Sequence, residues 1–183
     1  MRPKKERPIT ARYLENAAKF YLERYPSTAE GLRRVLTRRV HKAKMAEAPI
    51  VVEVEKVIDA IVAKFVHAGM IDDRAFAQTK ARALHRRGTS TRLTRQRLKL
   101  AGIDSETLDQ AMAGLDQELD TDPQQREWQA AVALARRRRL GPFREKGRKE
   151  HRARDLAAMA RGGFAYDLAR RVIDAEERDI IDP

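Results

Sequence analysis

The stretch from residue 69 to residue 108 carries the start and stop signals of two short helices and the beginning of a third. Gly69 favours the left-handed backbone conformation that closes a helix. Asp72 is placed to cap the next helix, because its carboxylate can accept hydrogen bonds from free amides of the first turn. Ile71 and Phe76 flank this cap at the spacing of a hydrophobic staple. The same signals recur at Gly102, Ile103, Asp104 and Leu108.

The same stretch is strongly basic. Between Arg74 and Leu100 there are nine Lys or Arg residues and no acidic residue. The whole chain of 183 residues contains 39 Lys or Arg and 27 Asp or Glu, which gives a formal net charge of +12 and a pI near 10.4. This balance favours a polyanionic partner, either nucleic acid or an acidic protein surface.

Helical periodicity and capping signals extend along almost the whole chain. Thr10 is expected to cap a first helix, and Ser27 with Glu30 forms the pattern of a capping box for a second. Residues 50–68 are rich in β-branched side chains, but their apolar spacing and their length favour a helix over a strand. The sequence therefore predicts an all-α fold with helices near 10–25, 27–46, 50–68, 72–87, 90–101, 104–119, 122–139, 144–161 and 164–177.

These helices fall into three groups of three that share a register. Leu36, Leu98 and Met159 are separated by 62 and 61 residues and occupy corresponding positions in the pattern. A period near 60 residues with matched caps predicts repeats in which each group buries the open face of its neighbour. We therefore expect three tandem three-helix repeats forming an elongated, curved body. The expected divisions are a disordered basic tail over 1–8 and repeats over 9–69, 70–121 and 122–183.

The sequence lacks the usual patterns of an enzyme or a metal site. Cysteine is absent, so neither a disulfide framework nor a thiolate metal site is expected. The pair Asp72-Asp73 would suit a metal-dependent nuclease, but helix capping already accounts for Asp72. The four histidines are scattered without metal-ligand spacing. From these patterns we expect no catalytic residues, no metal and no cofactor. Neither a signal peptide nor an apolar run of about 18 residues occurs, so we also expect a cytoplasmic protein without membrane contact.

Several motifs, taken in order, resemble the RecX family. The most specific are Gly-Met-Ile-Asp-Asp-Arg-Ala-Phe-Ala over 69–77, Arg-Arg-Gly over 86–88 and Leu-Lys-Leu-Ala-Gly-Ile over 98–103. Residues 27–36 resemble the opening pattern of the family, and the sequence Ala-Arg-Gly-Gly-Phe-Ala-Tyr-Asp over 160–167 resembles its closing pattern. The order and spacing of these motifs carry the resemblance, which covers nearly the whole chain.

This resemblance implies a fold and a partner. RecX proteins regulate the RecA recombinase in recombination, DNA repair and the SOS response, and are understood as three tandem three-helix repeats. They bind RecA, lie in the groove of its filament on DNA and damp its activities. Three positions depart from the family pattern: Gly31 separates Glu30 from Leu32, Val40 replaces a helix-ending glycine, and Ala165 replaces a capping serine. We expect these departures to affect only local structure in the first and third repeats.

Charge is segregated by helix along the sequence. Residues 123–163 contain 12 basic and 4 acidic residues, whereas residues 104–122 contain seven acidic residues and no basic one. A groove-binding regulator needs such segregation, with cations against phosphates or acidic loops and the acids elsewhere for solubility. Exposed arginine-rich faces are also common in basic proteins, and cations at the end of a helix complement its dipole. The sequence therefore leaves a solvated surface open as an alternative.

The candidate binding residues lie on few helices. Arg92, Arg95 and Lys99 are at positions i, i+3 and i+7, so they are expected on one exposed face turned away from Leu93 and Leu100. The run from Arg136 to Arg139 covers a full helical turn, so at most two of its members can face one ligand. The residues that we predict to contact DNA or a protein partner are Arg82, Arg86, Arg87, Arg92, Arg95, Lys99, Arg136, Arg139, Arg148 and Arg152.

Two functional hypotheses from different classes are consistent with these observations, and a third has little support. The first is a non-enzymatic, monomeric regulator that binds the groove of the RecA nucleoprotein filament and inhibits its recombinase and ATPase activities. Such a protein would contact single- or double-stranded DNA, but only weakly on its own. The alternative is a sequence-independent DNA-binding architectural protein. A metal-dependent nuclease has only Asp72-Asp73 in its favour.

Overall fold

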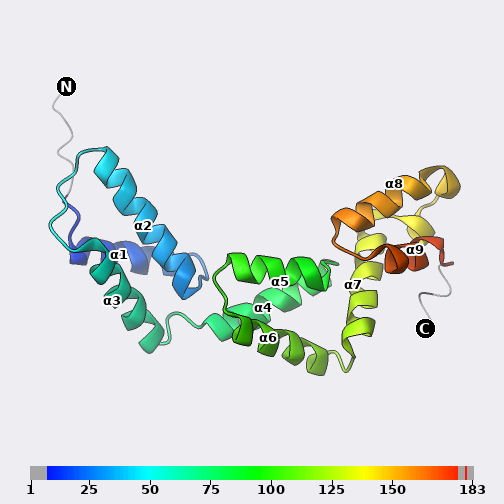
Figure 1. Cartoon of the computed structure of the whole chain (residues 1–183), viewed down its shortest axis with the longest axis horizontal. Helices are drawn as coiled ribbons and strands as arrows, with labels where there is room; N and C mark the ends of the chain where they lie inside the picture. The colour runs from blue at the N-terminus through cyan, green and yellow to red at the C-terminus, as the bar shows by residue number, and fades with distance from the viewer. Residues whose placement is uncertain (1–7, 177–179, 181–183) are drawn as a thin grey trace. The chain divides into compact units, whose positions relative to one another are not determined.

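The computed structural model of the protein describes residues 8–176 and residue 180. Within them all regular structure is helical, apart from one isolated β-bridge (Figure 1). The all-α prediction is confirmed, whereas the elongated, curved body and the three repeat boundaries stay predictions. The tail predicted over 1–8 lies outside the described residues, except for Pro8. The elements are α1 (Ala11–Leu22), α2 (Ala29–Met45), α3 (Val54–His67), α4 (Asp73–Arg86), α5 (Thr91–Leu100), α6 (Ser105–Glu118), α7 (Pro123–Arg138), the 3-10 helix η1 (Gly141–Phe143), α8 (Arg148–Arg161) and α9 (Tyr166–Asp174).

The chain divides into two compact units. Unit 1 contains the described residues up to Phe76 together with the turn at 101–103. Within it α1, α2 and α3 pack against one another around an apolar core (Figure 1). Leu14, Leu36 and Phe65 are fully buried in this core. Each such side chain stabilises the packing by about 1.5–3 kcal/mol relative to an exposed position.

Unit 2 contains residues 77–100 and the described residues from Asp104 onwards. Its C-terminal part packs α7, α8, α9 and η1 around a second apolar core. At the start of α7, the buried Arg126 binds the carboxylate of Asp116 on α6. The neighbouring Glu127 accepts hydrogen bonds from the amide and hydroxyl of Thr91, at 2.8 and 2.5 Å, and so caps α5. These bonds fix α7 against α5 and α6.

A buried carboxylate holds η1 onto α8. Asp155 accepts hydrogen bonds from the amide of Gly141 at 2.9 Å and from Nε and Nη2 of Arg144 at 3.1 and 2.7 Å. Burial raises the pKa of Asp155, but the Arg144 guanidinium and the Gly141 amide outweigh it, so the pKa lies below its usual value. The carboxylate is therefore ionised in the folded protein at neutral pH and organises the loop between α7 and α8.

The capping predictions were correct at three helices. The hydroxyl of Thr10 and the carboxylates of Asp72 and Asp104 each accept a hydrogen bond from the amide three residues further on, at 3.1, 2.8 and 2.8 Å. Gly69 and Gly102 have φ angles of 68° and 90°, in the left-handed region expected for helix-closing residues. These signals are local in sequence, which is why they could be recognised without the fold.

The capping box predicted at Ser27 and Glu30 was wrong. The cap is Thr28, whose hydroxyl accepts a hydrogen bond from the amide of Gly31 at 2.9 Å. The same hydroxyl donates to the carbonyl of Ala101 at 2.5 Å, a contact that local spacing could not reveal. Glu30 does not reach back to the cap, because its carboxylate pairs with two arginines of α2.

Two predicted helices begin later than expected. The segment before α3 is extended, and Ile50 forms a parallel β-bridge with Ile9, so α3 begins at Val54 and not near residue 50. Similarly, α8 begins at Arg148 and not near residue 144. Its delay follows from the binding of Arg144 by Asp155 and from the left-handed conformation of Gly147, with a φ of 67°.

Two glycine turns make the same kind of contact at corresponding places. Gly102, after α5, would place a Cβ only 2.3 Å from Glu30 Cβ at the start of α2, within unit 1. Gly163, after α8, would place a Cβ 2.3 Å from the hydroxyl oxygen of Ser90, which caps α5, within unit 2. Each turn can therefore pack this closely only because its residue has no side chain.

Candidate polyanion-binding surfaces

The acidic helix α6 neutralises two of the predicted binding residues. Nε of Arg82 lies 2.5 Å from the carboxylate of Glu118, and Arg95 binds the carboxylate of Asp109. The expectation that the acids of residues 104–122 lie apart from the basic helices was therefore wrong for these pairs. Acidic and basic residues that are separated along the sequence form ion pairs between helices, because α6 packs beside α4 and α5. These half-exposed pairs contribute about 0–1 kcal/mol each and leave less positive charge for a ligand.

Two further candidates hold α9 in place. Arg152 forms a bidentate pair with Asp174, with both N–O distances at 2.6 Å. This pair raises the pKa of Arg152 and lowers that of Asp174. Nη2 of Arg148 donates to the carbonyl of Ile173 at 2.9 Å and to that of Ala175. Both side chains thus bind the C-terminal end of α9, where free carbonyls need donors.

The two candidates at the end of α7 lie in different surroundings. Arg136 places its guanidinium carbon 5.2 Å from the centre of the Phe143 ring, within range of a cation–π contact. Arg139 closes the helix in the left-handed conformation, with a φ of 53°. Its guanidinium is 4.0 Å from the carboxylate of Glu145, and both side chains are largely exposed. Neither contact removes the charge from solvent.

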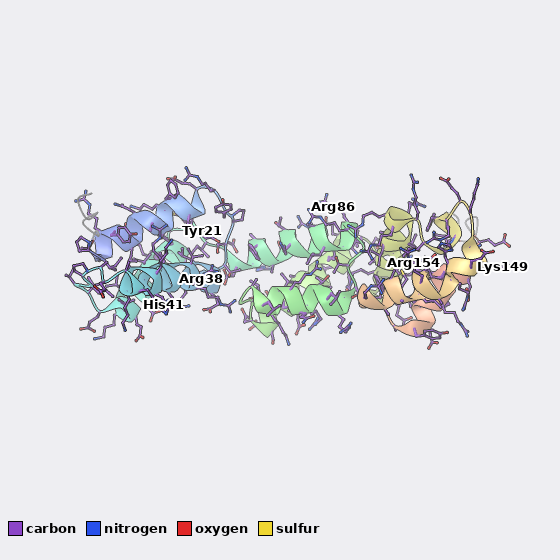
Figure 2. All side chains as sticks on the ribbon, turned by 90° about the horizontal axis from the view of Figure 1, so that it is seen from above. Tyr21, Arg38, His41, Arg86, Lys149 and Arg154 are labelled. Carbon is purple, nitrogen blue, oxygen red and sulfur yellow. The ribbon has the colours of Figure 1, made fainter. Side chains whose placement is uncertain are left out.

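Four other predicted residues are exposed and unneutralised. The side chains of Arg86, Arg87, Arg92 and Lys99 are exposed and form no hydrogen bond or ion pair to another described residue. Figure 2 labels Arg86 at the end of α4. In α5 Leu98 and Thr94 are buried, whereas Leu100 is 66% exposed, so the buried face of α5 is centred on Leu98 and not on Leu100.

An arginine groove in unit 2 was missed by sequence reasoning. It is a cavity of about 230 Å³ lined by Arg97 of α5, Arg137 and Arg138 of α7, and Arg161 of α8. Its lining contains no acidic residue within the described part of the chain, and none of the four guanidiniums has an ion-pair partner there. Two members of the run at 136–139 line this groove, and the expectation that at most two of them face one ligand stays a prediction. Arg136 and Arg139, the two members predicted from the sequence to bind a partner, do not line it.

Close backbone packing builds this arginine groove. A Cβ on Gly88, whose φ is 68°, would lie 2.3 Å from the amide nitrogen of Leu134. A Cβ on Gly162 would lie 2.6 Å from Leu134 Cδ2. The turn after α4 and the turn after α8 thus both approach the same residue of α7. This approach brings together arginines that are far apart in the sequence.

A second basic surface lies on α2, within unit 1. Arg38, Lys42 and Lys44 are exposed and have no ion-pair partner among the described residues. Figure 2 labels Arg38 on this helix. Two other arginines of α2 bind Glu30 and so carry less free charge. The run of basic residues between 33 and 44 is the sequence signal that could have indicated this surface.

The acidic pair considered for a nuclease has structural partners. Asp72 caps α4, and Asp73 accepts a hydrogen bond from the amide of Ala29 at 2.9 Å. No cluster of three or more His, Cys, Asp or Glu residues suited to a metal occurs in the described residues. In the same part of the chain, no helix combines the length and apolarity that crossing a bilayer would require.

Taken together, capped short helices, glycine turns with recurring contacts and clustered free cations define a basic helical-repeat protein. The sequence profile of the second three-helix domain of RecX matches residues 72–112. The Regulatory protein RecX of Myxococcus xanthus is 41% identical over 175 residues, which cover 94% of this chain and 90% of that protein. The Regulatory protein RecX of Agrobacterium fabrum is 29% identical over 163 residues, covering 88% and 82%. The chain therefore belongs to the RecX family.

Solved structures support the same fold. The crystal structure of RecX from Lactobacillus salivarius matches with a TM-score of 0.59 at 19% identity, over 89% of this chain and 94% of that chain. A second crystal structure, of a regulatory protein RecX, matches with a TM-score of 0.58 at 19% identity, over 90% of this chain and 72% of that chain. At this identity the match concerns the fold alone.

Proposed function

We propose that this protein is a non-enzymatic regulator that binds the RecA nucleoprotein filament and inhibits its recombinase and ATPase activities. Membership of the RecX family supports the proposal, because its relatives are named regulatory proteins. The motifs at 69–77, 86–88 and 98–103 support RecA as the partner through their resemblance to the family. We further propose that the protein acts as a monomer in the cytoplasm, which sedimentation and cell fractionation would test.

The free cations on both units carry this proposal. Arg38 and Lys42 on α2, and Arg92 and Lys99 on α5, are exposed and lack an ionic partner among the residues described. A filament on DNA repeats its phosphates and acidic loops at regular intervals. One exposed ionic contact contributes at most about 1 kcal/mol, but several contacts from one chain add together through effective concentration. Tight binding would then require the assembled filament.

The test is the ATPase activity of purified RecA on single-stranded DNA while this protein is titrated in. We expect hydrolysis to fall to a plateau. The double variant Arg92→Gln with Lys99→Gln should need several-fold more protein to reach that plateau, because two contacts are lost. The control Lys149→Gln with Arg154→Gln removes the same charge from α8, where both residues lie (Figure 2), and should behave like the wild type. An unchanged rate at saturating wild-type protein would refute the proposal.

The arginine groove favours one other function, a sequence-independent DNA-binding architectural protein. Its four cations lack acidic neighbours within the described residues, as expected for a surface that contacts DNA without RecA. Gel shifts on DNA fragments of unrelated sequence distinguish the two proposals. Nanomolar binding to DNA alone, combined with no effect on RecA hydrolysis, would favour the architectural protein.

A further inference from the structure

We propose that the arginine groove binds a phosphodiester group of a nucleic-acid backbone. This inference deepens the proposed function and rests on it only for the choice of nucleic acid as the polyanion. It assigns the contact to Arg97, Arg137, Arg138 and Arg161, which come from three different helices of unit 2. None of the four is among the cations selected from the sequence.

The arginine groove carries positive charge that no described acidic residue neutralises, which favours the binding of an anion. Four arginines line one concave surface, and no described carboxylate forms an ion pair with any of them. A larger cavity of about 650 Å³ in unit 1 differs in this respect: its Arg33 and Arg34 both pair with Glu30, and Arg33 also pairs with Asp59. Like charges held together repel one another, and an entering anion relieves that repulsion. The arginine groove therefore has the electrostatics of an unoccupied anion site.

The size and lining of the groove select a phosphate group over a whole nucleotide. About 230 Å³ is smaller than the roughly 300–1,000 Å³ of pockets that enclose small organic ligands. Besides the arginines, the lining consists of Thr89, two leucines and two glycines, so no described aromatic ring is present to stack on a base. Contacts restricted to the backbone carry no sequence information. We therefore expect binding that is independent of base sequence.

The groove is preorganised for this contact. The main chain at Gly88 packs directly on the main chain of Leu134, and Gly162 packs on the same leucine side chain. These contacts fix the ends of the helices that carry the arginines. A guanidinium offers a planar fork of donors that matches two oxygens of one phosphate. Nucleic acid carries phosphate groups at high density along its backbone. Four clustered cations therefore match a nucleic-acid backbone better than they match an isolated carboxylate.

The experiment measures the binding of a fluorescein-labelled 30-residue oligothymidylate to the full chain by anisotropy, between 20 and 300 mM salt and without RecA. The groove variant is Arg97→Gln, Arg138→Gln and Arg161→Gln together. The matched control is Lys80→Gln, Lys149→Gln and Arg154→Gln, three exposed cations of unit 2 outside the groove. Each phosphate contact with a single strand adds about 0.7 to the slope of log affinity against log salt. The groove variant should therefore lose about 2 from that slope and bind roughly 100-fold more weakly at 50 mM salt.

Each other outcome would overturn the inference. Equal losses in the groove variant and the control would show that charge acts diffusely, and unchanged binding in the groove variant would show that the arginines are not used. Competition by polyglutamate as strong as that by unlabelled oligonucleotide would assign the groove to carboxylates. Wild-type protein that does not bind at 20 mM salt would also refute it. Circular dichroism establishes that both variants are folded, and RecA hydrolysis measured in parallel tests the proposed function separately.

Discussion

Gly88 offers a direct measure of how tightly the turn after α4 packs on α7. Its φ of 68° lies in the left-handed region, where an alanine costs about 1–2 kcal/mol. The added Cβ would also lie 2.3 Å from Leu134 N and 2.8 Å from Ala130 O, which are main-chain atoms. Forcing such groups apart costs a further 1–3 kcal/mol or so. We therefore expect Gly88→Ala to reduce the free energy of unfolding of unit 2 by about 2–5 kcal/mol.

A second glycine in the same unit provides the matched control. Gly147 has a φ of 67°, but the nearest atom to its added Cβ is His151 Nδ1 at 3.4 Å, an ordinary contact. Gly147→Ala should therefore cost only the conformational part, about 1–2 kcal/mol. The difference between the two variants isolates the packing of Gly88 on Leu134.

Urea unfolding followed by the fluorescence of Trp128 measures both variants. Trp128 is the only tryptophan of the chain and lies on α7, the helix that Gly88 contacts. With a slope of about 2 kcal/mol/M, Gly88→Ala should lower the urea midpoint by roughly 1–2.5 M, and Gly147→Ala by less than about 1 M. Equal shifts for the two variants would refute the close packing and, with it, the construction of the arginine groove.

Three further predictions concern stability and titration. Gly114→Ala on α6 should stabilise the protein by about 0.5–1 kcal/mol in the same urea assay, because a Cβ there meets no atom within 4 Å; destabilisation would contradict this. Hydrogen bonds from Lys64 and Lys19 lower the pKa of Glu15 to about 2; a carboxyl titration by NMR should show this value, and Lys64→Gln should move it back toward 4.5. Because the pKa of Asp155 is lowered on folding, its stabilisation is present above the unfolded pKa of about 3.9 and lost as pH falls through the folded value. Asp155→Asn should remove that acid dependence and cost about 3–5 kcal/mol at pH 7; acid unfolding unchanged from the wild type would refute this role.

How far the sequence predicted the structure depends on the range of each interaction. Thr10, Asp72 and Asp104 were identified as caps because each bond joins residues three apart. Ser27 was predicted as the cap of α2 in place of Thr28, because two adjacent hydroxyls cannot be distinguished from local spacing. The hydrogen bond from Thr28 to the carbonyl of Ala101 distinguishes them in the folded protein. The start of α3 was misplaced for the same reason, because the extended segment before it depends on a bridge to Ile9.

The candidate site was harder to predict than the fold. Counting charges located the basic helices, but the ion pairs of Arg82 and Arg95 depend on how α6 packs. The arginine groove joins Arg97 and Arg161, residues 64 positions apart, which the repeat spacing of 61 residues does not place at corresponding positions. Spacing along one helix can show which cations share a face. It cannot show which of them meet an acid, and that decides how much charge is free.

The two glycine turns also limit how the series of helices can grow. Gly102 packs at the start of α2 beside the Thr28 cap, and Gly163 packs on the Ser90 cap of α5. The corresponding helix further on, α8, starts after Gly147 and has no capping hydroxyl to receive another turn. A fourth set of helices fused to the C-terminus would therefore have no equivalent docking point. A set appended at the N-terminus would lack the other half of the contact, because α2 runs on past Val40 to Met45 and no glycine follows it before α3, so neither end of the series offers a complete docking contact.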